Sequence, residues 1–175
     1  DMISNAIEAD APAPVAMPIK WKIGTKRILY VGRFDRQKGA DLFLQAMKKL
    51  SQNYSAIMVG DFVVDCNFSL GEVPENTQQI GWLNAAQLEY FYQQADYLVM
   101  PSRWEGFGLV ALEGMRAGCV VIATEVGGLK EVVSHDVTGL LIEPESADAI
   151  VDAIEELTNE RASQMKIAAK ARVAK

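Results

Sequence analysis

The residues best placed for chemistry are two glutamates around a glycine loop. Glu105 comes just before Gly106 and Gly108, and Glu113 follows in an apolar segment that is compatible with a helix. An extended run, a glycine loop and a helix start leave the first N–H groups of the helix unpaired, and with the helix dipole these groups can bind a phosphate or another anion. Glu113 would lie about 7 Å further along the helix axis. The two carboxylates could therefore hold hydroxyl groups at two points of one elongated ligand.

Both glutamates also have purely structural interpretations. Glu105 alone can stabilise the helix dipole, which is the commoner use of a glutamate in a first turn. Glu113 lies between Leu112 and Gly114, in an apolar stretch where a carboxylate needs partners. Ribose hydroxyls would supply such partners, but so would an ion pair with Arg116, three residues further on.

A second glycine loop carries positive charge. Arg33 and Lys38 lie between Gly32 and Gly39, directly after an apolar run that ends at Val31. The two cations could neutralise a phosphate that approaches this loop. Lysine and arginine in loops are usually solvated surface residues, and that interpretation stands beside the first.

The elements that must position these loops alternate along the chain. Short apolar runs predict strands over residues 27–32, 55–60, 97–100, 120–123 and 140–142, and helical spacing of apolar residues marks 43–50, 84–95 and 147–157. Asn84 is the expected N-cap of the middle helix, with Gln87 completing a capping box. This alternation predicts an α/β fold with a doubly wound, Rossmann-like parallel sheet. Ligands of such sheets bind outside the carboxyl ends of the strands, where both glycine loops begin.

The stretch from Pro101 to Glu113 resembles the signature of retaining glycosyltransferases of the GT-B fold, family 4, also called glycosyl transferases group 1. Further stretches resemble the same family in the same order, namely residues 32–39, 117–124, 126–133 and 138–142. The resemblance covers residues 25–158 and implies the C-terminal, donor-binding half of a GT-B enzyme. It implies transfer of a sugar from a nucleoside diphosphate sugar with retention of configuration, and without a metal or other cofactor.

The resemblance also implies roles for individual residues. Arg33 and Lys38 would neutralise the diphosphate leaving group, Glu105 would orient the sugar hydroxyls, and Glu113 would hold the ribose. The catalytic residues would thus be Arg33, Lys38 and Glu105. The donor site would consist of Gly32, Arg33, Lys38, Trp82, Leu83, Glu105, Gly106, Phe107, Gly108, Leu109 and Glu113. Trp82, expected near the nucleobase, could equally be a partly buried core aromatic.

One segment departs from the family pattern. A second glycine is often found shortly after the second strand of this family, but here Gly60-Asp61 is followed by residues 62–68, which contain none. The backbone contacts of that turn, and with them the preference for a nucleobase, are therefore open. Residues 62–74 are expected to form an extra strand or hairpin.

The resemblance divides the chain into three parts. Residues 1–24 are expected to be an interdomain linker, because residues 3–8 resemble the hinge of the family. Residues 25–158 would form the nucleotide-sugar-binding domain, and 159–175 a C-terminal helix that the chain cuts short. The chain would then be half an enzyme, whose partner is a missing N-terminal domain that binds the acceptor.

Composition narrows the partners and the compartment. The net charge of −6 argues against nucleic acid, whose binding draws on clustered Lys and Arg. It does not argue against a nucleotide, because charges further away than a Debye length of about 8 Å are largely screened. No apolar run reaches the roughly 18 residues of a membrane span, so contact with the inner face of a membrane is expected only through the missing half. Two cysteines, without metal-ligand spacing or a disulfide framework, favour a cytoplasmic location.

Two other functions stay open. A nucleotide-sugar epimerase of the same fold would also need a phosphate loop and paired acids, but it would react without an acceptor. A non-catalytic nucleotide-sugar-binding module would need the same donor site without the catalytic half. The reading frame upstream of Asp1 would discriminate between these classes.

Overall fold

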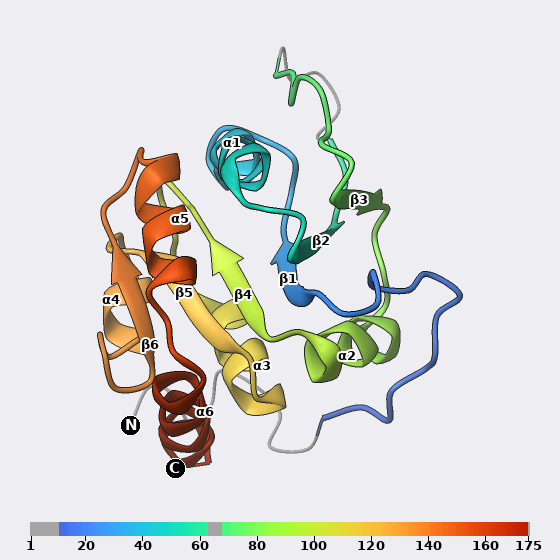
Figure 1. Cartoon of the computed structure of the whole chain (residues 1–175). Helices are drawn as coiled ribbons and strands as arrows, with labels where there is room; N and C mark the ends of the chain where they lie inside the picture. The colour runs from blue at the N-terminus through green and yellow to red at the C-terminus, as the bar shows by residue number, and fades with distance from the viewer. Residues whose placement is uncertain (1–10, 63–67, 175) are drawn as a thin grey trace.

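The protein is described by a computed structural model over residues 11–62 and 68–174. Its centre is a six-stranded sheet in the order β3-β2-β1-β4-β5-β6, and every neighbouring pair is parallel (Figure 1). The strands are β1 Lys26–Val31, β2 Tyr54–Val59, β3 Thr77–Ile80, β4 Tyr97–Met100, β5 Val120–Thr124 and β6 Gly139–Ile142. The helices are α1 Ala40–Lys49, α2 Ala85–Gln94, α3 Leu109–Ala117, α4 Leu129–Val132, α5 Ala147–Glu155 and α6 Asn159–Val173. The predicted doubly wound α/β fold is confirmed.

Helices cover both faces of the sheet, and each face has its own core cluster. Successive strand residues point to opposite faces, so Ile28 and Tyr30 of β1 enter one cluster while Leu29 and Val31 enter the other. The first cluster is closed by α1 and α5, the second by α2, α3 and α4, and α6 contributes to both. Because β1, β2, β4 and β5 are buried on both sides, they are mainly apolar runs, as their sequences indicated.

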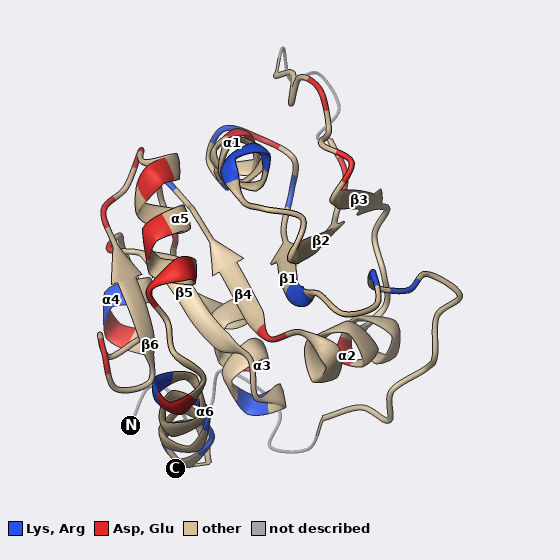
Figure 2. Ribbon diagram, viewed as in Figure 1, with Lys and Arg blue, Asp and Glu red and all other residues tan. Residues whose placement is uncertain are grey.

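Charge on the first face is complementary between its two helices. Helix α5 carries acidic residues along its length, and α1 ends with two lysines (Figure 2). Lys49 of α1 lies 2.5 Å from Asp148 of α5, with both side chains largely exposed.

The capping box predicted at the start of α2 is present. Asn84 accepts a hydrogen bond from the backbone of Gln87, whose side chain accepts one from the backbone of Asn84. The region before α2 differs from expectation. Residues 68–74 contain no strand or hairpin, and 63–67 lie outside the described residues. The edge strand β3 lies later, at Thr77–Ile80, with both glutamines exposed to solvent.

The segment before β1 packs onto the domain. Trp21 is buried and meets the ring of Phe91 edge-on at 6.3 Å. Upstream, the backbone N–H of Val15 donates to the carbonyl of Ala86. The hinge-like residues 3–8 lie outside the described part of the chain. Within that part, no helix is both long and apolar enough to cross a bilayer.

Candidate functional site

The strand order reverses between β1 and β4, because β2 and β3 lie on one side of β1 and β4 to β6 on the other. In open parallel sheets a ligand crevice forms at this switch point, outside the carboxyl ends of the strands. The loop after β1 (residues 32–39) and the loop after β4 (residues 101–108) both begin there. The two loops predicted to bind the donor are therefore neighbours at the most favourable place in the sheet.

The two loops touch through their backbones. The N–H of Arg103 donates to the carbonyl of Gln37 over 2.8 Å. Gly39 has a φ of 68°, and a Cβ there would lie 1.9 Å from the carbonyl oxygen of Pro101. Only glycine permits both this left-handed conformation and so close an approach.

The loop after β4 is held in the same way from its other side. A Cβ on Gly127, in the loop after β5, would lie 1.9 Å from the carbonyl oxygen of Glu105. The same oxygen accepts a hydrogen bond from the N–H of Gly128 at 3.1 Å. The main chain of Glu105 is thus fixed against the loop after β5.

Three helices that follow carboxyl ends of strands begin without a side-chain cap at the N-cap residue: α1, α3 and the four-residue α4. Gly39 and Gly108 are the N-caps of α1 and α3, both in the left-handed region, and a glycine has no side chain with which to cap a helix. In α1 the carboxylate of Asp41 interacts with the backbone N–H groups of Asp41 and Leu42. The helices α2, α5 and α6 are capped by the side chains of Asn84, Ser146 and Thr158. The first turns of α1 and α3 therefore direct N–H groups and positive dipole ends toward the switch point, which suits an anion.

Lys38 and Glu105 meet across the two loops. Lys38 Nζ lies 2.7 Å from Glu105 Oε2, with 22% of the lysine and 12% of the glutamate side chain exposed. Ser102 Oγ lies 3.5 Å from the same carboxylate oxygen. The structure thus brings two of the three predicted catalytic residues into direct contact.

The charge of Arg33, the third predicted catalytic residue, is offset within its own loop. Its Nε lies 2.9 Å from Asp35 Oδ2 without the alignment of a hydrogen bond, and its Nη2 donates to Gln37 Oε1 at 3.0 Å. Beneath the loop, the hydroxyl of Tyr30 donates to the carbonyl of Arg33. Burial, with the charge of Asp35 adding to it, raises the pKa of Tyr30, so this hydroxyl stays a donor.

Glu113 lies on the side of α3 that faces α2. The hydroxyl of the buried Tyr92 donates to Glu113 Oε2 over 2.9 Å. Burial raises the pKa of Tyr92, and the Glu113 carboxylate raises it further. The suggested ionic partner, Arg116, lies 3.2 Å from Glu89.

The remaining predicted donor residues differ in exposure. Phe107 and Leu109 are exposed at the start of α3, and Gly106 is exposed beside them. Trp82 is 59% exposed, so the interpretation of it as a partly buried core aromatic is wrong. Leu83 packs against the second core cluster, and Gly32 is half-buried at the end of β1.

Arg103 is a residue of this edge that sequence reasoning missed. Its guanidinium forms two hydrogen bonds to Asp41 of α1, at 2.8 and 2.9 Å. It also donates to the carbonyl of Arg36 and to Glu145. Burial alone would raise the pKa of Asp41, but the hydrogen bonds and charge of Arg103 outweigh it and lower that pKa.

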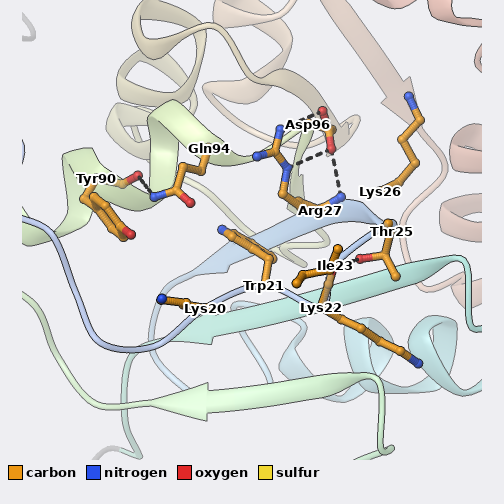
Figure 3. Close-up of a pocket in the computed structure, with 11 residues that line it drawn as sticks. Lys20, Trp21, Lys22, Ile23, Thr25, Lys26, Arg27, Tyr90, Gln94 and Asp96 are labelled. Atoms are coloured by element: carbon orange, nitrogen blue, oxygen red, sulfur yellow. Dashed lines mark hydrogen bonds and ion pairs between the residues drawn. The ribbon is translucent and has the colours of Figure 1, made fainter.

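A surface pocket of about 470 Å³ lies at the opposite end of the strands, before β1 and β4 begin (Figure 3). It is lined by residues 20–27 together with Tyr90, Gln94 and Asp96. Its cations do not converge, since Lys22 reaches Gln52, Lys26 reaches Asn159 and Arg27 is paired with Asp96. This pocket is remote from the loops at the switch point and does not resemble a phosphate site. Nowhere in residues 11–62 and 68–174 do three or more His, Cys, Asp or Glu side chains group as metal ligands would.

Comparisons with known proteins point to one family. Residues 18–174 match the family model described as glycosyl transferases group 1. An uncharacterized glycosyltransferase of Methanocaldococcus jannaschii is 35% identical over 142 residues, which cover 77% of this chain and 36% of that protein. The chain thus spans little more than a third of the length of such curated relatives.

Solved structures share the fold. Sucrose-phosphate synthase from Thermosynechococcus elongatus superposes with a TM-score of 0.76 and 32% identity, over 85% of this chain and 40% of that one. The C-terminal domain of a glycosyl transferase group 1 family protein from Francisella tularensis superposes with a TM-score of 0.79 and 25% identity, over 95% and 96%. The second structure is described as a C-terminal domain, and the match covers nearly all of both chains.

Proposed function

Because this chain belongs to the glycosyl transferases group 1 family, we propose that it is the donor-binding domain of a retaining glycosyltransferase. Its substrate would be a nucleoside diphosphate sugar, whose sugar passes to an acceptor held by another part of a longer protein. One observation carries the proposal: the loops that lead into α1 and α3, both helices with a glycine N-cap, touch at the switch point, and Lys38 lies in one of them.

The proposed chemistry is governed by the leaving diphosphate. As the bond from the anomeric carbon to the phosphate oxygen breaks, negative charge grows on the diphosphate. Lys38, Arg33 and the N–H groups at the two helix starts would stabilise this charge, which is the largest single effect in many enzymes. No metal ion or other cofactor has a role in this proposal.

Glu105 would orient the sugar. In the structure its carboxylate is paired with Lys38 at 2.7 Å. A bound diphosphate would compete for Lys38, because its charge is larger than that of one carboxylate. The carboxylate would then be free to accept hydrogen bonds from sugar hydroxyls, while Glu113 would accept one from the ribose.

Calorimetric titration with nucleosides, nucleoside monophosphates and nucleoside diphosphates of uracil, guanine and adenine tests the site. For the preferred base we expect the diphosphate to bind most tightly and the nucleoside hardly at all. Replacing Arg33 and Lys38 together with alanine should remove most of that ordering, and rising salt should weaken it, because partly exposed charges are screened.

The matched control is Lys20→Ala with Lys22→Ala, which removes the same charge from the opposite end of the strands. It should leave the ordering unchanged. If the Arg33/Lys38 variant bound the diphosphate as tightly as the parent at low salt, the assigned phosphate site would be wrong. A chelator should not change the affinity of the parent.

The chain alone should not transfer sugar, because the acceptor and the closure that excludes water would come from the rest of the protein. Turnover by residues 1–175 at the rate of the complete protein would contradict this. Interconversion of a sugar nucleotide without any acceptor would instead indicate an epimerase.

A further inference from the structure

Arg103 joins four segments at the switch point. Its backbone N–H and its side chain reach the carbonyls of Gln37 and Arg36, both in the loop that carries Lys38. The same side chain bonds Asp41 in the first turn of α1 and Glu145 before α5. Arg103 itself stands two residues before Glu105.

The contacts of Arg103 are well defined. Its side chain is only 16% exposed, and the two-pronged contact with Asp41 fixes the plane of the guanidinium. Glu145 adopts a φ of 62°, a conformation that residues other than glycine rarely adopt, and its carboxylate lies 2.7 Å from Arg103 Nε. The arginine is thus held by two carboxylates from segments that flank the site.

The charge balance of this cluster matters for an anion site. Asp41 lies in the first turn of α1, where its negative charge would oppose a phosphate bound at the same helix terminus. The guanidinium of Arg103 neutralises it through two charge-assisted hydrogen bonds. This neutralisation reduces the repulsion that Asp41 would exert on an anion at the N-terminus of α1.

We propose that Arg103 is a positioning residue of the donor site: it neutralises Asp41 and fixes the loop of Lys38 against the loop of Glu105. The inference rests on the proposed donor-binding function. Arg103 would not touch the donor, and it would act on the diphosphate through Lys38 and the N-terminus of α1. Loss of Arg103 should therefore weaken the contacts to the diphosphate more than the contacts to the rest of the nucleotide.

The test is calorimetric titration of the 175-residue chain with the diphosphate and the monophosphate of the base that the parent binds best, chosen among uridine, guanosine and adenosine. Arg103→Ala should weaken binding of the diphosphate about tenfold, which is the effect expected for one mispositioned charge-assisted contact. Binding of the monophosphate should weaken less. The ratio of the two affinities should therefore fall. Arg103→Lys keeps the charge but loses the two-pronged contact, so it should restore part of the ratio.

Arg36→Ala is the matched control, because it removes an exposed positive charge from the loop that carries Lys38. It should leave the ratio unchanged. A melting curve for each variant separates binding from folding. If Arg103→Ala does not fold, Asp41→Ala serves instead: it removes the carboxylate that Arg103 neutralises and leaves the Arg103 side chain with Glu145 and the carbonyl of Arg36. The ratio should change there too, and an unchanged ratio would overturn the inference.

Three further results overturn the inference. If Arg103→Ala melts earlier but the ratio of the two affinities is unchanged, the arginine is a structural link only. If the ratio of the two affinities fell equally in Arg36→Ala, the effect would come from the overall positive charge of the region. If the parent binds none of the three diphosphates, the proposed function fails and this inference fails with it, whereas the first two results leave donor binding intact.

Discussion

Lys38 and Glu105 form an ion pair of 2.7 Å across two loops that leave neighbouring strands. Both side chains are mostly enclosed, so water screens this ion pair less than it screens an exposed one. In the proposed mechanism the same two groups serve the diphosphate and the sugar. A mutation of either should therefore affect both the stability of the free protein and the binding of donor.

Lys38→Ala should lower the free energy of unfolding by about 2 kcal/mol, because it leaves the enclosed carboxylate of Glu105 without its cation. Urea unfolding near neutral pH measures the loss. Lys49→Ala is the control, since its ion pair with Asp148 is largely exposed, and it should cost less than about 1 kcal/mol. If the two variants lost the same free energy of unfolding, the enclosure of the Lys38–Glu105 pair would add nothing to its stabilising effect.

Glu113→Gln should weaken nucleoside diphosphate binding by about 1–3 kcal/mol if the carboxylate holds the ribose. The sharper measurement compares a ribonucleotide with its 2′,3′-dideoxy analogue. The parent should prefer the ribonucleotide, and the variant should lose most of this preference. Tyr92→Phe, which removes the hydroxyl bonded to Glu113, should lower stability but keep the preference. If Glu113→Gln kept the full preference for the ribonucleotide, Glu113 would not hold the ribose, and its role would be the structural contact with Tyr92.

Gly39→Ala should destabilise the protein strongly, because its Cβ would fall 1.9 Å from the carbonyl oxygen of Pro101. Gly24→Ala is a matched control: Gly24 has a similar φ of 78°, but a Cβ there would have no atom within 4 Å. The control should cost about 1 kcal/mol for the left-handed conformation alone. The difference between the two variants in urea unfolding isolates the contact between the loops, and equal losses would contradict it.

Acid should remove the stability that Asp41 and Asp96 supply. Burial would raise the pKa of each, but Arg103 and Arg27 lower it below the usual range. A lowered folded pKa gives stability above the unfolded value of about 3.9, and this stability is lost as pH falls through the folded value. Asp41→Asn and Asp96→Asn should therefore each lower the free energy of unfolding near pH 7, as measured by urea unfolding. The difference from the parent should shrink below about pH 3, and a constant difference would rule out this linkage.

Local patterns predicted much of this structure. The buried strands β1, β2, β4 and β5 are apolar runs, and the capping box of α2 needs only Asn84 and Gln87. The edge strand β3 was not assigned from its sequence, because its two glutamines face solvent and leave little apolar signal.

Contacts between distant residues were harder to predict. Arg103 and Asp41 are 62 positions apart, and each alone is typical of a charged surface residue. Only the order of the strands brings them together. The same holds for the ion pair of Lys38 with Glu105, although the loops that carry them were identified from their glycines.

The tryptophans make the carboxyl edge visible to fluorescence. Trp82 and Trp104 are 59% and 62% exposed there, while Trp21 is only 8% exposed on the second face of the sheet. Two of the three indoles in the chain therefore emit from a wet environment. Any molecule that covers this edge, whether a nucleotide or another part of the protein, should shift their emission to shorter wavelength and protect them from a soluble quencher such as acrylamide. Trp21 provides an internal reference within the same spectrum.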